Sequence, residues 1–198
     1  MPLDSKDFEG HFMEKFERRK QTPQYWFNKS SDLRASTGAV WYCIKHDEDK
    51  EIAEELGLGI GFSMAVATYP IFPMLCGLSL ELMYKAICVV KNKTFVHEKH
   101  NLRKLCNLAE VPATKEDLLF LDLFTESVKW DGKYPVPHDK NAFEGLNKLR
   151  DKLLFEEIPN THIKRYNERL NWDTFNALWI KAAMKFDHAK TNDCGISG

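Results

Sequence analysis

A lysine, a tryptophan and a histidine stand close together in the segment VKWDGKYPVPH, residues 128–138. A histidine near a cation can act as acid or base in RNA cleavage, where the 2′-hydroxyl attacks and the cation binds the phosphate. His138 and Lys133 are therefore the candidate catalytic residues. The two prolines of the segment, and Gly132 with its access to positive φ, equally suit a rigid turn that ends one helix before Asp139 caps the next.

A carboxylate and a lysine lie one helical turn apart in the most apolar part of the chain, at Glu81 and Lys85. An exposed pair would contribute little, but the neighbouring residues offer little polar surface, and a buried charge needs a partner. We expect Glu81 to be at least partly buried and to bind a basic residue or backbone amides of residues 128–138. Trp130 and Tyr134 would then crowd beside it at a ligand-facing edge.

Further basic residues suit phosphate contact, because Arg and Lys can bind phosphates while neighbouring aromatic rings stack on bases. Arg103 follows His100 by three positions, and Lys129 precedes Trp130. Acidic residues are interleaved with them, and 28 basic against 29 acidic residues give a net charge of −1. A solvated mixed-charge face is therefore the simpler interpretation of this set, with ligand binding as the alternative.

Other kinds of chemistry find less support. Cys88, His97, His100 and Cys106 could supply zinc ligands, but no second cysteine lies near Cys88, whereas structural zinc sites use short Cys-to-Cys loops. The sequence contains neither a Gly-x-Ser-x-Gly elbow nor a Gly-x-x-x-x-Gly-Lys run, and no predicted strand precedes the glycines of residues 57–61. We therefore predict no metal and no cofactor, and we expect Cys88 and Cys106 to be small core residues.

Helical signals recur along the chain, whereas the alternating pattern of strands is absent. They predict one domain, residues 1–198, that folds as an all-α up-and-down bundle of five to seven helices. Residues 1–22 would form an N-terminal extension helix, and residues 191–198 a frayed tail. The other predicted helices cover residues 24–45, 70–91, 100–108, 115–128 with Thr114 as N-cap, 139–155 and 171–189.

The helix over residues 70–91 should be the best-buried element, with one apolar face at Phe72, Leu75, Leu78, Leu82, Ala86 and Val89. It overlaps an uncharged stretch, residues 56–80, that is long enough to cross a bilayer. Prolines and glycines interrupt this stretch and no basic cluster flanks it, which favours a flexible linker and a core helix over a membrane span. Five cysteines and an N-terminus without an apolar signal-peptide core indicate a cytoplasmic protein.

Three segments in order resemble the HEPN family, the nucleotide-binding domains of higher eukaryotes and prokaryotes. Residues 77–87, GLSLELMYKAI, are similar to its E-x-x-x-K-A helix, and residues 100–105, HNLRKL, to its H-x-L-x-x-L segment. Residues 123–137, LFTESVKWDGKYPVP, are similar to a W-x-G-R-Y-P-V-P signature of a bacterial branch. The resemblance covers residues 73–137. The flanking segments agree with the family only in being helical, without a matching motif.

This resemblance implies a helical bundle, often a homodimer, found in RNases of toxin–antitoxin and defence systems and in noncatalytic relatives that bind nucleotides or RNA. Catalytic members carry an R-x4-6-H motif, and no arginine of this chain precedes a histidine at that spacing. Lys133 and His138 are spaced in this way, but lysine lacks the planar fork that grips phosphate. The expected function is thus a cytoplasmic module that binds a nucleotide, RNA or a cognate partner protein, with a metal-independent endoribonuclease as the alternative. The expected ligand contacts are Glu81, Lys85, His100, Arg103, Trp130 and Tyr134.

Overall fold

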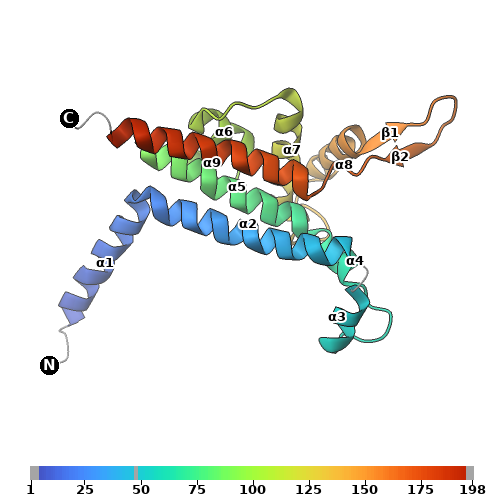
Figure 1. The fold of residues 1–198 in the computed structure, drawn as a ribbon, viewed down its shortest axis with the longest axis horizontal. Coiled ribbons are helices and arrows are strands. Elements are labelled where there is room, and N and C mark those ends of the chain that lie inside the picture. The colour runs from blue at the N-terminus through green and yellow to red at the C-terminus, as the bar shows by residue number, and fades with distance from the viewer. Residues whose placement is uncertain (1–4, 47–48, 195–198) are drawn as a thin grey trace.

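The computed structural model describes residues 5–46 and 49–194, and it confirms the predicted all-α helical bundle (Figure 1). Each predicted helix is present. Of the predicted frayed tail, residues 191–194 belong to the last helix, and residues 195–198 lie outside the described part, as do residues 1–4 of the predicted N-terminal helix. The elements are α1 (Ser5–Gln21), α2 (Pro23–Lys45), α3 (Asp49–Glu55), α4 (Met64–Thr68), α5 (Ile71–Val90), η1 (Val96–Glu98), α6 (Leu102–Ala109), α7 (Lys115–Glu126), η2 (Ser127–Asp131), α8 (Lys140–Leu154), β1 (Phe155–Glu157), β2 (Lys164–Tyr166) and α9 (Trp172–Cys194).

The core is built around α5, which packs against α2, α6, α7, η2 and α9. Figure 1 shows α2 running antiparallel to α5, and α9 packs against both of these helices, with the ring of Phe186 stacked on that of Phe27 at 4.8 Å. A helix that is apolar all round belongs in a protein interior, and α5 has this character. The prediction that this helix is the best-buried element is confirmed by the complete burial of Cys76, Leu80 and Met83.

The single apolar face predicted for this helix is wrong. Leu75, Leu78 and Leu82 are only partly buried, whereas residues between them are fully buried. A periodic stripe identifies the buried face only when the opposite face meets water, and here several helices surround α5. The segment Met64–Val90 is also long and apolar enough to span a membrane. However, 67% of its 18-residue apolar stretch is buried inside the protein, as in a core helix.

A buried network of hydroxyl groups joins the three long helices. Ser30 Oγ of α2 donates to the Ser79 carbonyl of α5 at 2.7 Å, and Ser79 Oγ donates back to the Ser30 carbonyl at 2.8 Å. Trp179 Nε1 of α9 donates to Ser30 Oγ at 2.9 Å. Because each buried polar group finds a partner, these small residues let the helices approach closely without a desolvation penalty.

Two local features were not predicted. The first part of residues 56–80, expected to be a flexible linker, contains the short helix α4, and Ser63 caps it by accepting from the Val66 amide; the short helix α3 precedes this segment. After α8, β1 and β2 form an antiparallel hairpin in which Phe155 pairs with Tyr166. Strands of three residues are too short to show an alternating pattern, so sequence periodicity could not reveal them.

Segment 128–138 begins as helix rather than as loop. Thr114, the predicted N-cap, forms a capping box with Asp117 at the start of α7, and η2 continues α7 as a π-helix through Asp131. Gly132 has φ −80°, so the expectation of positive φ is wrong. This glycine is instead required by close packing, because a Cβ there would lie 2.5 Å from Cβ of Met74.

A second glycine lets α5 and η2 meet, and it generates a testable prediction. A Cβ on Gly77 would lie 2.6 Å from Cγ2 of Val128 and 2.9 Å from the Phe124 carbonyl oxygen. Gly77→Ala should therefore lower the free energy of unfolding by about 1–3 kcal/mol, because backbone cannot move aside as a flexible side chain can. Urea unfolding followed by circular dichroism measures this change.

The matched control is Gly145→Ala in α8, where a Cβ would meet no atom within 4 Å. It should leave stability unchanged or raise it by up to ~1 kcal/mol, because alanine favours helix. Equal effects of the two substitutions would contradict the packing described for Gly77.

Candidate functional site

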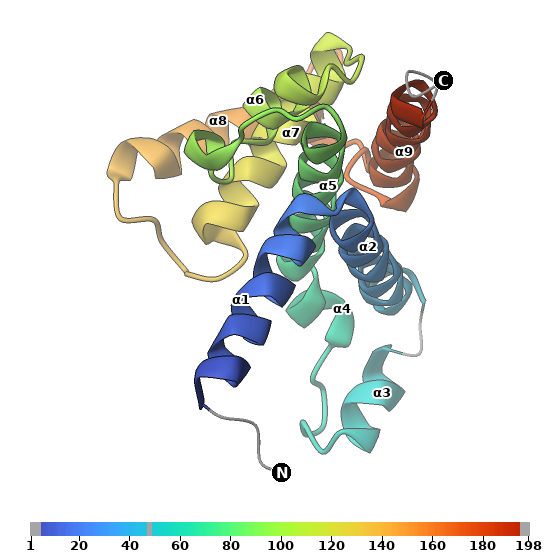
Figure 2. The same cartoon turned by 90° about the vertical axis from the view of Figure 1, so that its left-hand side faces the viewer.

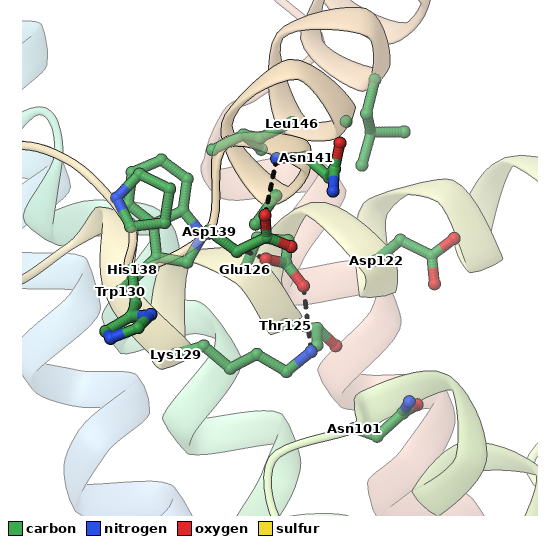
Figure 3. A pocket seen from close by; sticks show the side chains of 14 residues that line it. Asn101, Asp122, Thr125, Glu126, Lys129, Trp130, His138, Asp139, Asn141 and Leu146 are labelled. Atoms are coloured by element: carbon green, nitrogen blue, oxygen red, sulfur yellow. Dashed lines mark hydrogen bonds and ion pairs between the residues drawn. The ribbon is translucent and has the colours of Figure 1, made fainter.

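A cleft of about 700 Å³ lies between α7 and α8, and it brings together residues from distant parts of the chain (Figure 3). The side of α8 supplies small and apolar residues, α7 and η2 supply most of the polar ones, and the loop before α8 lies at one end. The lining residues are Asn101, Asp122, Thr125, Glu126, Lys129, Trp130, Pro137, His138, Asp139, Asn141, Ala142, Gly145, Leu146 and Leu149.

Hydrogen bonds of Glu126 fix the wall formed by α7 and η2. Its carboxylate accepts from Lys129 Nζ at 3.0 Å and from Trp130 Nε1 at 3.0 Å. The indole of Trp130 is buried, and it lies 6.3 Å from the ring of Phe143 on α8. Trp130 is therefore a structural wall of the cleft that offers only an edge to a ligand.

An ion pair ties η2 to α8 near the same wall. Arg150 Nη2 donates to Asp131 Oδ2 at 2.6 Å. Partial burial raises the pKa of the Asp131 carboxyl, although the Arg150 guanidinium opposes this shift. The pair holds the two sides of the cleft at a fixed separation, because a half-buried charge that loses its partner is costly.

The carboxylates of the cleft already have donors. Asp122 receives a two-pronged hydrogen bond from Arg103, and this bond raises the pKa of the arginine. The Asp139 carboxylate accepts a hydrogen bond from the backbone N–H of Asn141 at 3.0 Å and caps α8, as predicted. Lys129 neutralises Glu126. A mixed-charge pocket results, rather than an anionic metal-binding one.

His138 lies in the loop at the end of this cleft. Its side chain is exposed, and its imidazole makes no hydrogen bond with the part of the chain that the structure describes (Figure 3). The side-chain amide nitrogens of Asn101 and Asn141 likewise have no partner among the described residues. These groups remain available to a ligand.

The other candidate catalytic residue lies elsewhere. Lys133 does not line the cleft, and its Nζ lies 5.9 Å from the centre of the Tyr134 ring. Tyr134 is largely exposed, with 59% of its surface accessible. The structure thus brings Trp130 and His138 to one cleft, but it leaves Lys133 and Tyr134 outside.

Glu81 forms a separate cluster with two other predicted site residues. It is buried, as predicted, with 4% of its surface exposed. Lys85 Nζ donates to one carboxylate oxygen at 2.6 Å, and His100 Nδ1 lies 2.9 Å from the other. Lys85 also lies 6.0 Å from the ring centre of Trp26 and 5.7 Å from that of Phe95.

The expected partner of Glu81 was wrong, because residues 128–138 contact α5 one turn earlier. Gly132 lies against Met74, and Gly77 lies against Val128. The two glycines set this register, since only they allow such close approach. Glu81 is satisfied by Lys85 and His100 instead, so this cluster joins α5 to the start of α6 and does not line the cleft.

The cysteines occupy apolar surroundings, as predicted for Cys88 and Cys106. Burial raises the pKa of the Cys88 thiol to about 11, and it also raises the pKa of Cys106 and Cys76. Buried thiols with raised pKa values are poor nucleophiles. Over residues 5–46 and 49–194, no group of three or more His, Cys, Asp and Glu side chains could hold a metal ion.

Several lining residues were missed from the sequence. No motif distinguishes Asp122 and Glu126 from other charges on a helix face, or Asn141 from other residues in the first turn of a helix. Asp122 and Glu126 are four residues apart and therefore lie on one side of α7. That this side borders a cleft depends on the position of α8, which the spacing does not reveal.

No protein-family model, curated protein sequence or solved structure matches this chain. The HEPN resemblance therefore stays a prediction from short motifs, and the function is argued from the geometry of the site.

The Glu81 cluster allows a direct test of burial. Glu81→Gln removes the charge that pairs with Lys85, whose side chain is 16% exposed, and should lower the free energy of unfolding by about 2–4 kcal/mol. The control is Glu144→Gln, which breaks the exposed Lys140–Glu144 pair at 3.6 Å and should change stability by less than ~1 kcal/mol. Chemical denaturation at pH 7 compares the two, and equal losses would contradict the role given to Glu81.

Proposed function

We propose that this protein is a binding module that holds a nucleotide in the cleft between α7 and α8 without cleaving it. The nucleotide is either a free nucleoside monophosphate or one residue of single-stranded RNA. The observation that carries the proposal is that His138, Asn101 and Asn141 line one cleft with an apolar side, while the His138 imidazole and the two side-chain amide nitrogens have no hydrogen-bond partner among the described residues. Its volume of about 700 Å³ lies within the range of small-molecule sites.

The chemistry of the lining fits the parts of a nucleotide. A planar base can lie against Ala142 and Leu149 of α8, because every base has an apolar face. The amide groups of Asn101 and Asn141 can donate to base edges and accept from them. His138 can contact a phosphate.

The charges of the cleft limit the number of phosphates. Asp122, Glu126 and Asp139 offset the basic groups around them, and would repel a long polyphosphate. We therefore expect a nucleoside monophosphate to bind more tightly than the corresponding triphosphate.

The second candidate function, a metal-independent endoribonuclease, is favoured by one observation: the His138 imidazole lines the cleft and makes no hydrogen bond within residues 5–46 and 49–194. Phosphate cleavage also needs a cation that stabilises the developing charge. Lys133, the expected cation, lies outside the lining, and Lys129 is held by Glu126. Binding without cleavage is the function that the arrangement supports better.

Binding is tested with the four nucleoside 5′-monophosphates by calorimetry and with fluorescein-labelled single-stranded RNA by polarisation. Ala142→Phe should weaken binding at least tenfold because it fills the cleft, and His138→Ala about three- to tenfold because it removes a phosphate contact. His162→Ala, an exposed histidine of the hairpin turn, should change nothing. The proposal fails if the wild type shows no saturable binding at millimolar nucleotide, or if Ala142→Phe binds as the wild type does.

The noncatalytic part of the proposal is tested with total RNA in the presence of a metal chelator. RNA should remain intact at a large excess of protein. Cleavage that disappears in His138→Ala but persists in His162→Ala would establish the endoribonuclease instead.

A further inference from the structure

The chain exposes more surface than a folded monomer of its size should. Its accessible area is 12975 Å², whereas a monomer of 23.0 kDa is expected to expose about 9,600 Å². The excess is larger than the ~800 Å² per partner of an ordinary protein–protein interface. Three segments project from the bundle, namely α1, the α3–α4 region and the β1–β2 hairpin, and of these α1 and the α3–α4 region leave opposite ends of α2 and point to the same side (Figures 1 and 2).

One end of α2 carries an apolar groove. Phe16 of α1, Tyr25 and Trp26 of α2, Leu82 of α5 and Phe95 line a cavity of about 490 Å³. Phe12 and Met13 extend the exposed apolar surface along α1, with 63% and 54% of their surfaces accessible. Arg19, Lys20 and Lys29 also line the groove and make it basic.

Beyond the other end of α2 lies an exposed apolar loop, residues 56–63. Ile60 is 99% exposed, and Leu56, Leu58 and Phe62 are exposed beside it. The loop has a defined shape, because the Leu58 amide donates to the Ala53 carbonyl at 2.9 Å and Ser63 Oγ donates to Asp49 at 2.5 Å. Holding a large apolar side chain fully in water forgoes about 1.5–3 kcal/mol, so this conformation indicates a surface that another molecule covers.

The two ends are complementary in charge. The helix α3, which leads into the apolar loop, carries Asp49, Glu51, Glu54 and Glu55 against a single lysine, Lys50. The groove at the opposite end carries Arg19, Lys20 and Lys29, and α1 ends with Arg18, Arg19 and Lys20. Complementary patches of this kind on one chain suit self-association, since each supplies what the other lacks.

We propose that a second copy of this chain covers this face, with the two α2 helices antiparallel about a two-fold axis. The apolar loop of each copy then packs into the apolar groove of the other, and α3 of each copy meets the basic rim. A two-fold axis makes each loop–groove contact twice, which closes the dimer. Small exposed side chains at Ala35, Ser36 and Ala39 along the middle of α2 leave room for the helices to approach.

Other occupants fit these observations less well. A membrane of anionic lipids would be repelled by the acidic α3 beside the apolar loop. An unrelated protein would have to present a basic groove and an acidic apolar loop together, and this chain already presents both. The α7–α8 cleft contributes no residue to the proposed interface, so this inference is independent of the proposed function.

Sedimentation equilibrium of the wild type should give twice 23.0 kDa at micromolar concentrations. Ile60→Asp in the loop and Phe16→Lys in the groove should each raise the dimer dissociation constant at least tenfold. The control is Ile163→Asp in the hairpin, a residue that is 64% exposed and should leave the dimer intact. Circular dichroism verifies that each variant keeps its helical fold.

A mixture of the two defective variants tests the pairing itself. A heterodimer of Ile60→Asp with Phe16→Lys contains one unaltered loop–groove contact and one contact in which aspartate meets lysine. The mixture should therefore dimerise more tightly than either variant alone. Each of three results would overturn the proposal. The wild type could stay monomeric at about 100 µM, a concentration at which even weak dimers form. The dimer could be unchanged in both variants, or the mixture could dimerise no more tightly than its components.

Discussion

The burial of α5 on nearly every side is the constraint on which the rest of the structure depends. A helix in that position cannot leave a polar group without a partner, so Ser79 exchanges hydrogen bonds with Ser30, and Glu81 binds Lys85 and His100. Where α7 and η2 approach α5 most closely, α5 has a glycine, Gly77, in place of a residue with a side chain. The helix is therefore both the core of the protein and the template that sets the register of the elements around it.

The cleft follows from that register. Gly77 and Gly132 seat η2 against the first half of α5, and the chain then leaves η2, passes through a proline-containing loop and returns as α8. The Asp131–Arg150 pair fixes α8 at a distance from α7 that leaves the space between them open at the surface. The segment VKWDGKYPVPH is thus structural in its first half, where Trp130 forms a wall, and available to a ligand in its second half, where His138 stands at the edge.

Local signals in the sequence were enough for the helices, the Thr114 capping box, the Asp139 cap and the burial of Glu81, because each depends on residues within one or two turns. Contacts between distant segments were not. The partner of Glu81 was misassigned because the register of η2 on α5 is set by two glycines, and a glycine in a sequence does not say whether it serves a turn or a close approach. The cleft itself needs the position of α8, which no periodicity contains.

The central claim is that the α7–α8 cleft binds a nucleotide, and a titration of ¹⁵N-labelled protein with adenosine 5′-monophosphate, followed by NMR, tests it most directly. The account predicts saturable shifts at the backbone amides of Asn101, Lys129, His138 and Asn141, with those of Glu81, Lys85 and the α1–α2 groove unchanged. Saturable shifts confined to another surface, or none at millimolar nucleotide for this and the other three monophosphates, would contradict it.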